Sequence, residues 1–316
     1  MHTHKHDITE NLCVYEVDSL VEGPVVAITA NVHGDECTGV AVVHQLLEDV
    51  SYILRGKLLL FSSLNPLGLQ NMSRQIPGQQ DDLNRVFPGD AYGEPTEKHA
   101  HTIWKTLEQF SPSVLIDIHT DSGNAIPYVL VDRCIHTNIK LVQQTWEMAE
   151  ASGYFHLWEY PLAEYKRFSL EKSLAGAGLN HLRIPSLTLE IGPRRYLHPV
   201  AVRQAVSAVW RMLGYWNMVH VESLEDMCKV LPVSQAIYGV WRRANGPSTK
   251  VGGLIFPLVE VGKLLHKGTA IAKILHSNGQ CINTIFADKT MVILAFPDAG
   301  YVRDWACVCT IAVPEE

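Results

Sequence analysis

A histidine and a glutamate three residues apart, His33 and Glu36, follow an apolar run at residues 25–30 that predicts a buried strand. A helical pattern starts directly after them, so both side chains are placed where a strand ends and a helix begins. On a first helical turn, residues at this spacing face the same side. Imidazole and carboxylate groups are ligands of tetrahedral zinc sites. The pair therefore predicts part of a metal site, with a third protein ligand at another strand end and one position open for water.

His119 is the candidate for that third ligand, because it closes a second apolar run at residues 114–118. Asp117 lies two residues earlier, on the same face of the predicted strand, where it can orient an imidazole. The alternative is a histidine that caps the strand or bonds within the core. Taken with the first pair, His119 completes a site for one Zn²⁺ per subunit, held by His33, Glu36 and His119.

Glu190 is a carboxylate within the apolar strand pattern at residues 186–191. Burying a lone carboxylate is costly and raises its pKa, so this side chain needs a partner or a chemical role. Beside a metal-bound water the role is that of general base and then general acid. A structural salt bridge to Arg194 or Arg195 is the alternative.

A long polar stretch at residues 65–95 carries the remaining candidates. The arginine fork of Arg85 can bind a substrate carboxylate through two hydrogen bonds, and Asn84 adds a donor beside it. Arg74 is a separate cation, suited to polarising a carbonyl and stabilising an oxyanion. Surface arginines are the ordinary alternative, but irregular connections this long are uncommon in compact domains and usually functional.

The elements that must position these residues alternate along the first two thirds of the chain. Strand patterns cover residues 25–30, 57–64, 114–118, 128–131 and 186–191, and helical patterns cover 38–47, 96–110, 138–152 and 199–218. The helix at 96–110 has Thr96 as its predicted N-cap. Such alternation predicts an α/β fold with a mixed, mainly parallel sheet flanked by helices, where ligands bind at the carboxyl ends of the strands.

The pattern changes near residue 222. Beyond it, short β-like runs alternate with turn signals such as Asn245-Gly246-Pro247 and Asn278-Gly279, and no long helical period appears. We therefore expect two domains: a zinc hydrolase domain of α/β type at residues 1–222 and a smaller all-β barrel or sandwich at 223–316.

Composition excludes several classes of protein. The 316 residues are 47% hydrophobic and 19% charged, with a net charge of -7 and no long basic run, which argues against nucleic acid as a partner. No segment predicts a signal peptide or a membrane span. Seven cysteines without paired spacing fit reduced thiols in a cytoplasmic protein. The oligomeric state stays open, a homo-oligomer included. The alternating His2, His4 and His6 predict a disordered tail, or else a weak site for a stray metal.

The motifs together resemble one family. His33-Gly34-Asp35-Glu36, Asn65-Pro66, Asp82-Leu83-Asn84-Arg85, Asp117-Ile118-His119 and Leu189-Glu190 occur in the order seen in the succinylglutamate desuccinylase/aspartoacylase family, a branch of the zinc carboxypeptidase superfamily. The resemblance implies a zinc carboxypeptidase-like fold. It also implies zinc ligands at His33, Glu36 and His119, a catalytic Glu190, a carbonyl-side Arg74 and a carboxylate clamp at Asn84 and Arg85.

The contacts that hold a second substrate carboxylate in aspartoacylases do not carry over. No arginine occupies residues 174–182, and the stand-ins are Arg167, Arg183, Arg194, Arg195 and Tyr196. The sequence around Asn84 is closer to bacterial deacylases that resemble N-acetyl-diaminobutyrate deacetylase.

The function expected from this set is a zinc-dependent amidohydrolase that converts a small N-acyl amino acid into a free amino acid and a carboxylic acid. A metallocarboxypeptidase acting on peptide C-termini is the first alternative, because the same atoms serve both reactions. A binding protein that kept the fold is the second, and it predicts loss of a metal ligand or of Glu190.

Overall fold

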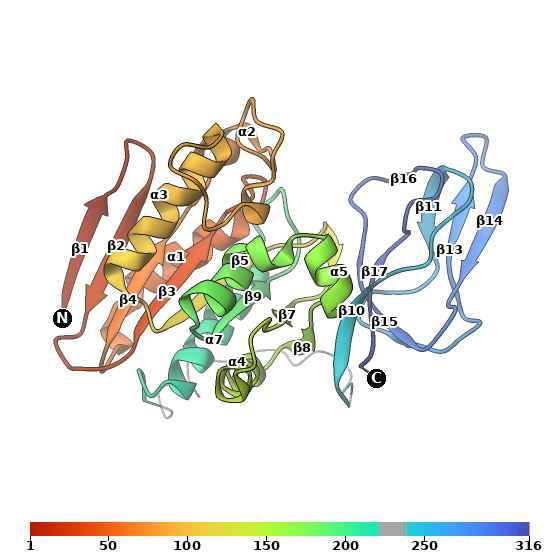
Figure 1. Cartoon of the computed structure of the whole chain (residues 1–316). Coiled ribbons are helices and arrows are strands. Elements are labelled where there is room, and N and C mark those ends of the chain that lie inside the picture. Colours follow the sequence, from red (N-terminus) through yellow and green to blue (C-terminus); the bar gives the residue numbers. More distant parts are fainter. Residues whose placement is uncertain (221–236, 238, 316) are drawn as a thin grey trace.

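The protein is described from a computed structural model, which places residues 1–220, 237 and 239–315. A 13-stranded sheet runs the length of the molecule (Figure 1), and twelve of its strands follow the order β1-β2-β4-β3-β5-β9-β7-β8-β10-β17-β15-β12. Its first eight strands are β1 (His2–Asp7), β2 (Cys13–Asp18), β4 (Lys57–Phe61), β3 (Val25–Ala30), β5 (Val114–His119), β9 (Ser186–Glu190), β7 (Tyr128–Val131) and β8 (Phe155–Trp158). Strands β4, β3, β5 and β9 are parallel, which confirms the mainly parallel part of the prediction.

Helices cover both faces of this sheet. They are α1 (Thr38–Glu48), α2 (Pro66–Asn71), α3 (Pro95–Phe110), α4 (Ile139–Ala151), α5 (Leu162–Arg167), α6 (Leu174–Ala177) and α7 (Pro199–Tyr215), with short turns at Val50–Tyr52, Leu83–Arg85, Leu170–Lys172 and Gly178–Leu182. Alternate residues of β3 show the two layers. Val26 and Ile28 pack with α1, α4 and α7, whereas Ala27 packs with α3 and α6. A strand buried on both faces reads as a continuous apolar run, as residues 25–30 do.

The C-terminal region extends the same sheet. Strand β10 (Trp241–Asn245) meets β8 through the parallel pair Arg242 and Trp158, and β17 (Thr310–Pro314), β15 (Met291–Phe296) and β12 (Leu264–Leu265) follow it. The short β6 (Asn124–Ala125) pairs with β15. A second sheet, β14 (Cys281–Phe286), β13 (Ala270–Leu275), β11 (Gly253–Pro257) and β16 (Tyr301–Val302), shares an apolar core with β15 and β17. This separate all-β region confirms that part of the predicted fold. The boundary predicted at residue 222 lies outside the described residues.

Two local expectations were wrong. Residues 2–7 form the edge strand β1, because each backbone position pairs with β2, so they are not a loose tail. Helix α3 begins earlier than expected, with Glu94 as N-cap and Glu97 completing a capping box, and Thr96 is buried instead.

Among the described residues, no helix is long and apolar enough to cross a membrane.

Candidate active site

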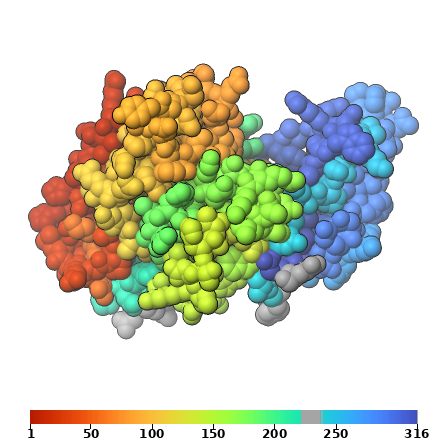
Figure 2. All heavy atoms as spheres, viewed as in Figure 1, coloured from red at the N-terminus to blue at the C-terminus, as the bar shows by residue number. Residues whose placement is uncertain are grey.

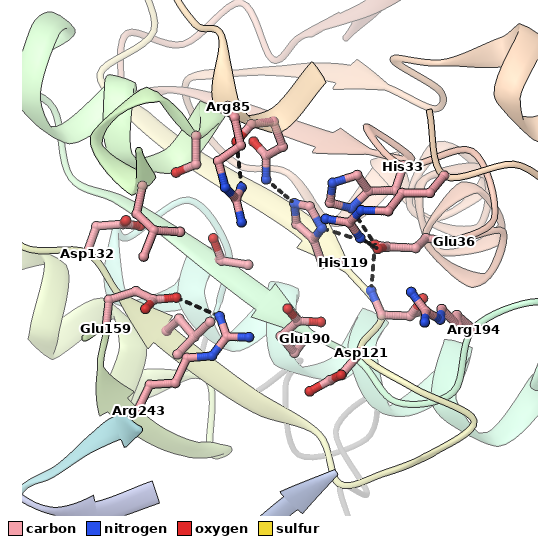
Figure 3. A pocket seen from close by; sticks show the side chains of 17 residues that line it. His33, Glu36, Arg85, His119, Asp121, Asp132, Glu159, Glu190, Arg194 and Arg243 are labelled. Carbon is pink, nitrogen blue, oxygen red and sulfur yellow. Dashed lines mark hydrogen bonds and ion pairs between the residues drawn. The ribbon is translucent and has the colours of Figure 1, made fainter. Parts of the chain in front are cut away.

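The carboxyl ends of the three central strands converge on one cavity (Figure 3). His33 follows β3, His119 ends β5 and Glu190 ends β9, and His119 is the register partner of Glu190. The cavity is lined by every site residue expected from the sequence: His33, Glu36, Arg74, Asn84, Arg85, His119 and Glu190. The sheet therefore brings together residues that lie more than a hundred positions apart, and their roles remain predictions.

His33 and Glu36 lie in a tight turn before α1, not on its first turn as the sequence suggested. Asn31 takes a left-handed φ of 60°, and its amide donates to the carbonyl oxygens of His33 at 2.9 Å and of Gly34 at 3.1 Å. Gly34 is required here, because a Cβ at this position would lie 2.1 Å from the carbonyl carbon of Gly68 in α2. The turn is thus fixed from both sides, and it points both candidate ligands into the cavity.

The two imidazoles and the carboxylate form a compact buried cluster. Glu36 Oε1 lies 2.7 Å from His33 Nδ1, and Glu36 Oε2 lies 3.0 Å from His119 Nδ1. One potential ligand atom from each residue lies within 4.8 Å of the others, which is compatible with a bound metal ion. The backbone amide of Thr120 donates to Glu36 Oε2 at 2.9 Å and fixes the carboxylate. Two imidazoles and a carboxylate suit a metal ion of zinc type.

Each imidazole has a carboxylate on its other nitrogen. Asp117 Oδ2 lies 2.8 Å from His119 Nε2, and Asp82 Oδ1 lies 3.1 Å from His33 Nε2. Such partners fix ring orientation and raise the basicity of a metal-binding histidine. Asp117 was expected from its spacing, whereas Asp82 was missed because it reaches the site from a loop. Its signal was present in the Asp82-Leu83-Asn84-Arg85 motif.

The pKa values of two glutamates of the cavity, Glu36 and Glu190, are shifted in opposite directions. Burial alone would raise the pKa of Glu36, but His33 and His119 outweigh it and hold the pKa well below its usual range. Burial raises the pKa of Glu190 to about 8, with Asp121 and Glu36 adding to the shift and His119 opposing it. Glu190 Oε2 is buried without a hydrogen-bond partner. The salt bridge to Arg194 or Arg195 that would have explained this carboxylate is absent among the described residues.

The two arginines of the polar loop, Arg74 and Arg85, have different partners. Arg74 donates to Asp82 Oδ2 at 2.8 Å, and its other terminal nitrogen lies 3.8 Å from Glu36 Oε1. Arg85 donates to the carbonyl oxygen of Asn84 at 2.6 Å, and no carboxylate of the described part of the chain forms an ion pair with it. Asn84 accepts from the amide of Leu174 at 2.7 Å, which leaves its NH₂ group facing His119 Nε2 at 3.4 Å.

Three residues that line the cavity, here called its far wall, were not predicted from the sequence: Asp132, Glu159 and Arg243. Arg243 enters from β10 and donates to Glu159 Oε1 at 2.8 Å, with its guanidinium 5.3 Å from the Tyr160 ring centre. Asp132 lines the same wall, and burial beside Glu159 raises its pKa to about 8 although Tyr165 donates to it. Nothing in the sequence ties a β-domain arginine to a strand-end glutamate, since this contact depends on the pairing of β8 with β10.

Arg194 is the one stand-in for a second-carboxylate contact that lines the cavity. Asp298, in the turn after β15, accepts hydrogen bonds from Arg194 and from the backbone amide of Gly123. The other stand-ins do not line it: Arg167, Arg183, Arg195 and Tyr196.

Comparison with known proteins agrees with this geometry. One curated relative, N-alpha-acetyl-L-2,4-diaminobutyric acid deacetylase of Halomonas elongata, is 33% identical over 104 residues, which span only 31% of this chain and 29% of the relative. An aspartoacylase family protein of Mesorhizobium loti superposes with a TM-score of 0.77 at 18% identity, covering 100% of this chain and 99% of the other. A metallo-carboxypeptidase of Burkholderia cenocepacia superposes with a TM-score of 0.55 at 12% identity, covering 68% and 65%. At these identities the two structures establish the fold.

The family follows from a longer match. The model of the succinylglutamate desuccinylase/aspartoacylase catalytic domain matches residues 22–216, which is more than half of the chain and includes every candidate site residue. The chain therefore belongs to the succinylglutamate desuccinylase/aspartoacylase family.

Proposed function

We propose that this protein is a zinc-dependent amidohydrolase that removes the acyl group from a small N-acyl amino acid. The observation that carries the proposal is that one cavity holds both the His33–Glu36–His119 cluster and Glu190, whose buried Oε2 has no hydrogen-bond partner. A metal site beside an unsatisfied carboxyl is the arrangement that metal-assisted hydrolysis requires.

The residues fit the metal that the family implies. His33, Glu36 and His119 would hold it through Nδ1, a carboxylate oxygen and Nδ1, since the outer nitrogens already face Asp82 and Asp117. When bound, zinc supplies a Lewis acid that polarises the scissile carbonyl and acidifies a water molecule.

Different side chains of the cavity then transfer the proton, stabilise the oxyanion and bind the substrate carboxylate. Glu190 takes a proton from the attacking water and returns it to the leaving nitrogen, for which its elevated pKa is suited. Arg74 lies beside Glu36 and donates to the oxygen that becomes negative as the carbonyl is attacked. Arg85, which has no ion-pair partner in the described chain, binds the carboxylate of the amino-acid part, with the NH₂ group of Asn84 beside it.

The far wall narrows the choice of substrate. Asp132 and Glu159 lie on this wall, where Arg243 donates to Glu159; burial, with Glu159 adding to the shift and Arg85 opposing it, raises the pKa of Asp132 to about 8. A ligand ammonium group beside Asp132 would favour the ionised form of this carboxyl and pair with it. We therefore propose an amino acid with a cationic side chain, and this agrees with the diamino acid named in the Halomonas elongata relative.

Peptide hydrolysis is the second candidate, supported by the fold shared with a metallo-carboxypeptidase. Deacylation and peptide hydrolysis would use the same catalytic residues. The two activities differ in how much space the cavity must provide for the acyl side of the scissile bond. We place the enzyme in the cytoplasm, in keeping with free thiols at every described cysteine.

The decisive test starts with metal analysis of the purified protein. The zinc-loaded protein is then screened against N-acetyl, N-formyl and N-succinyl amino acids, with N-acetylated 2,4-diaminobutyrate, its 2-aminobutyrate analogue and a dipeptide series. Preference for the diamino compound over its uncharged analogue supports the full proposal. Cleavage of dipeptides alone identifies a carboxypeptidase, and no turnover of any amide refutes the amidohydrolase.

A further inference from the structure

The alternating histidines at the N-terminus lie together on one face of an ordered strand. In β1 the side chains of His2, His4 and His6 share a face, because residues two apart in a strand point the same way. The antiparallel register places Asp18 opposite His2 and Glu16 opposite His4. Three imidazoles and two carboxylates therefore gather on one side of the β1–β2 hairpin, which forms the red edge of the molecule in Figure 2.

This cluster repeats the composition of the catalytic one. Glu16 Oε2 lies 3.0 Å from His6 Nε2, the same separation as between Glu36 Oε2 and His119 Nδ1. The catalytic pair of rings, His33 and His119, has centroids 5.1 Å apart, and this spacing serves as an internal standard for two imidazoles that can share one ion.

The rings of His4 and His6 lie farther apart than those of His33 and His119. The His4 and His6 centroids are 6.5 Å apart, so they exceed the catalytic spacing by 1.4 Å (6.5 − 5.1). His4 is exposed, and rotation of an exposed side chain between its rotamers covers such a distance at little cost. His6 is less free, since its ring packs edge-on against Phe110 at 5.1 Å and is held toward Glu16. His4, whose ring is stacked on that of His2 at 6.1 Å, would rotate to join His6 and Glu16, which are already together.

The charges around the cluster keep the carboxylate available. Lys57 binds Glu16 Oε1 at 2.9 Å and Asp18 at 2.8 Å, which leaves Glu16 Oε2 for His6. The hydrogen bond from Lys57 lowers the pKa of Glu16, with His6 contributing to the shift, so Glu16 is ionised near neutral pH. A cation that enters meets one ammonium group and two carboxylates on this face.

We propose that His4, His6 and Glu16 form a second, surface site for Zn²⁺, at the end of the sheet away from the catalytic cavity. Imidazole and carboxylate ligands suit this ion, and a pair of histidines in an i, i+2 relation on a strand can chelate it. The bound ion links β1 to β2 and stabilises the edge hairpin, because binding only to the folded hairpin shifts the equilibrium toward it. The inference is independent of the proposed enzymatic activity.

The test is a zinc titration of the full-length protein by isothermal calorimetry, after the catalytic site has received one equivalent of zinc. The buffer is held at about pH 8, where free imidazoles are neutral. We expect one further equivalent to bind, and the variants His4→Gln and His6→Gln each to weaken that step by about 10-fold or more. Glutamine keeps the size and polarity of the side chain, and circular dichroism checks that each variant is folded.

Two controls separate this site from others. His266→Ala removes an exposed histidine from the C-terminal β region and should leave the second equivalent unchanged. His119→Ala should abolish the buried site and keep the surface one. Absence of a second equivalent, its persistence at full affinity in both glutamine variants, or equal weakening by His266→Ala would each overturn the proposal.

Discussion

Replacement of Glu190 by glutamine separates the proton-carrying role from the shape of the side chain. The two side chains have the same length, and glutamine fills the space of the buried carboxyl, so the fold and the metal cluster should persist. Glutamine cannot accept the proton of the attacking water. Asp121 also lines the cavity, where its Oδ2 accepts a hydrogen bond from the Tyr128 hydroxyl at 2.6 Å.

The expected loss follows from these contacts. General acid–base catalysis contributes about 10²- to 10⁴-fold in rate, or about 2.7 to 5.5 kcal/mol of barrier. Glu190 is only 9% exposed, so bulk water has little access to replace it, and we expect kcat to fall toward the larger limit. KM should change little, because the residues proposed to bind the substrate carboxylate, Arg85 and Asn84, are unchanged.

The assay measures amine release under saturating substrate, together with zinc content per chain. Glu171→Gln is the matched control, since Glu171 also has a buried carboxylate oxygen without a partner but lies outside the cavity.

As a base, Glu190 must be ionised, so the wild-type rate should fall as pH drops through its pKa. Burial raises that pKa to about 8, and a bound cation lowers it, which places the acid limb below that value. A glutamine variant that keeps zinc and a rate near the wild type would refute the assignment.

Other substitutions test the remaining roles. His119→Ala should lose both bound zinc and hydrolysis, and full zinc occupancy measured by atomic absorption would contradict the ligand assignment. Arg85→Ala should raise KM by about 10-fold or more, as expected for loss of a charge-assisted carboxylate contact, and an unchanged KM would count against the clamp. For Asp132→Asn we expect a gain in stability that grows with pH. The folded pKa is about 8 and the ordinary value 3.8, so between them only the folded wild type keeps the proton and its unfolding free energy falls as pH rises. Urea unfolding at about pH 5 and pH 8 checks the sign, and a gain that shrinks with pH would contradict it.

The central part of the site was predictable because it depends on local sequence. His119 and Glu190 end apolar strands, and parallel strands place their carboxyl ends at one edge of the sheet, so convergence followed from the strand pattern. The His33–Glu36 pair was found from its spacing, although the turn that holds it was not. That turn depends on the left-handed Asn31 and on contact with α2, and neither has a strong local signal.

The outer parts of the site could not be predicted, because they depend on contacts between distant segments. Asp82 reaches His33 across a loop of irregular structure, and Arg243 reaches Glu159 only because β10 pairs with β8. The edge strand β1 was missed for a related reason. Its polar residues have no apolar alternation, and its order comes from pairing with β2.

These distant contacts also bear on the choice between a deacylase and a peptidase. The C-terminal region reaches the cavity at two places, through Arg243 bound to Glu159 and through Asp298 bound to Arg194. An acyl part as long as a peptide must leave the cavity, and to pass either contact it would have to separate a partly buried ion pair. Separation of such a pair leaves two partly buried charges without their partners, which is unfavourable. A short acyl group leaves both pairs intact. On this reasoning we propose a small N-acyl amino acid rather than a peptide, and the dipeptide series of the hydrolysis screen checks the choice.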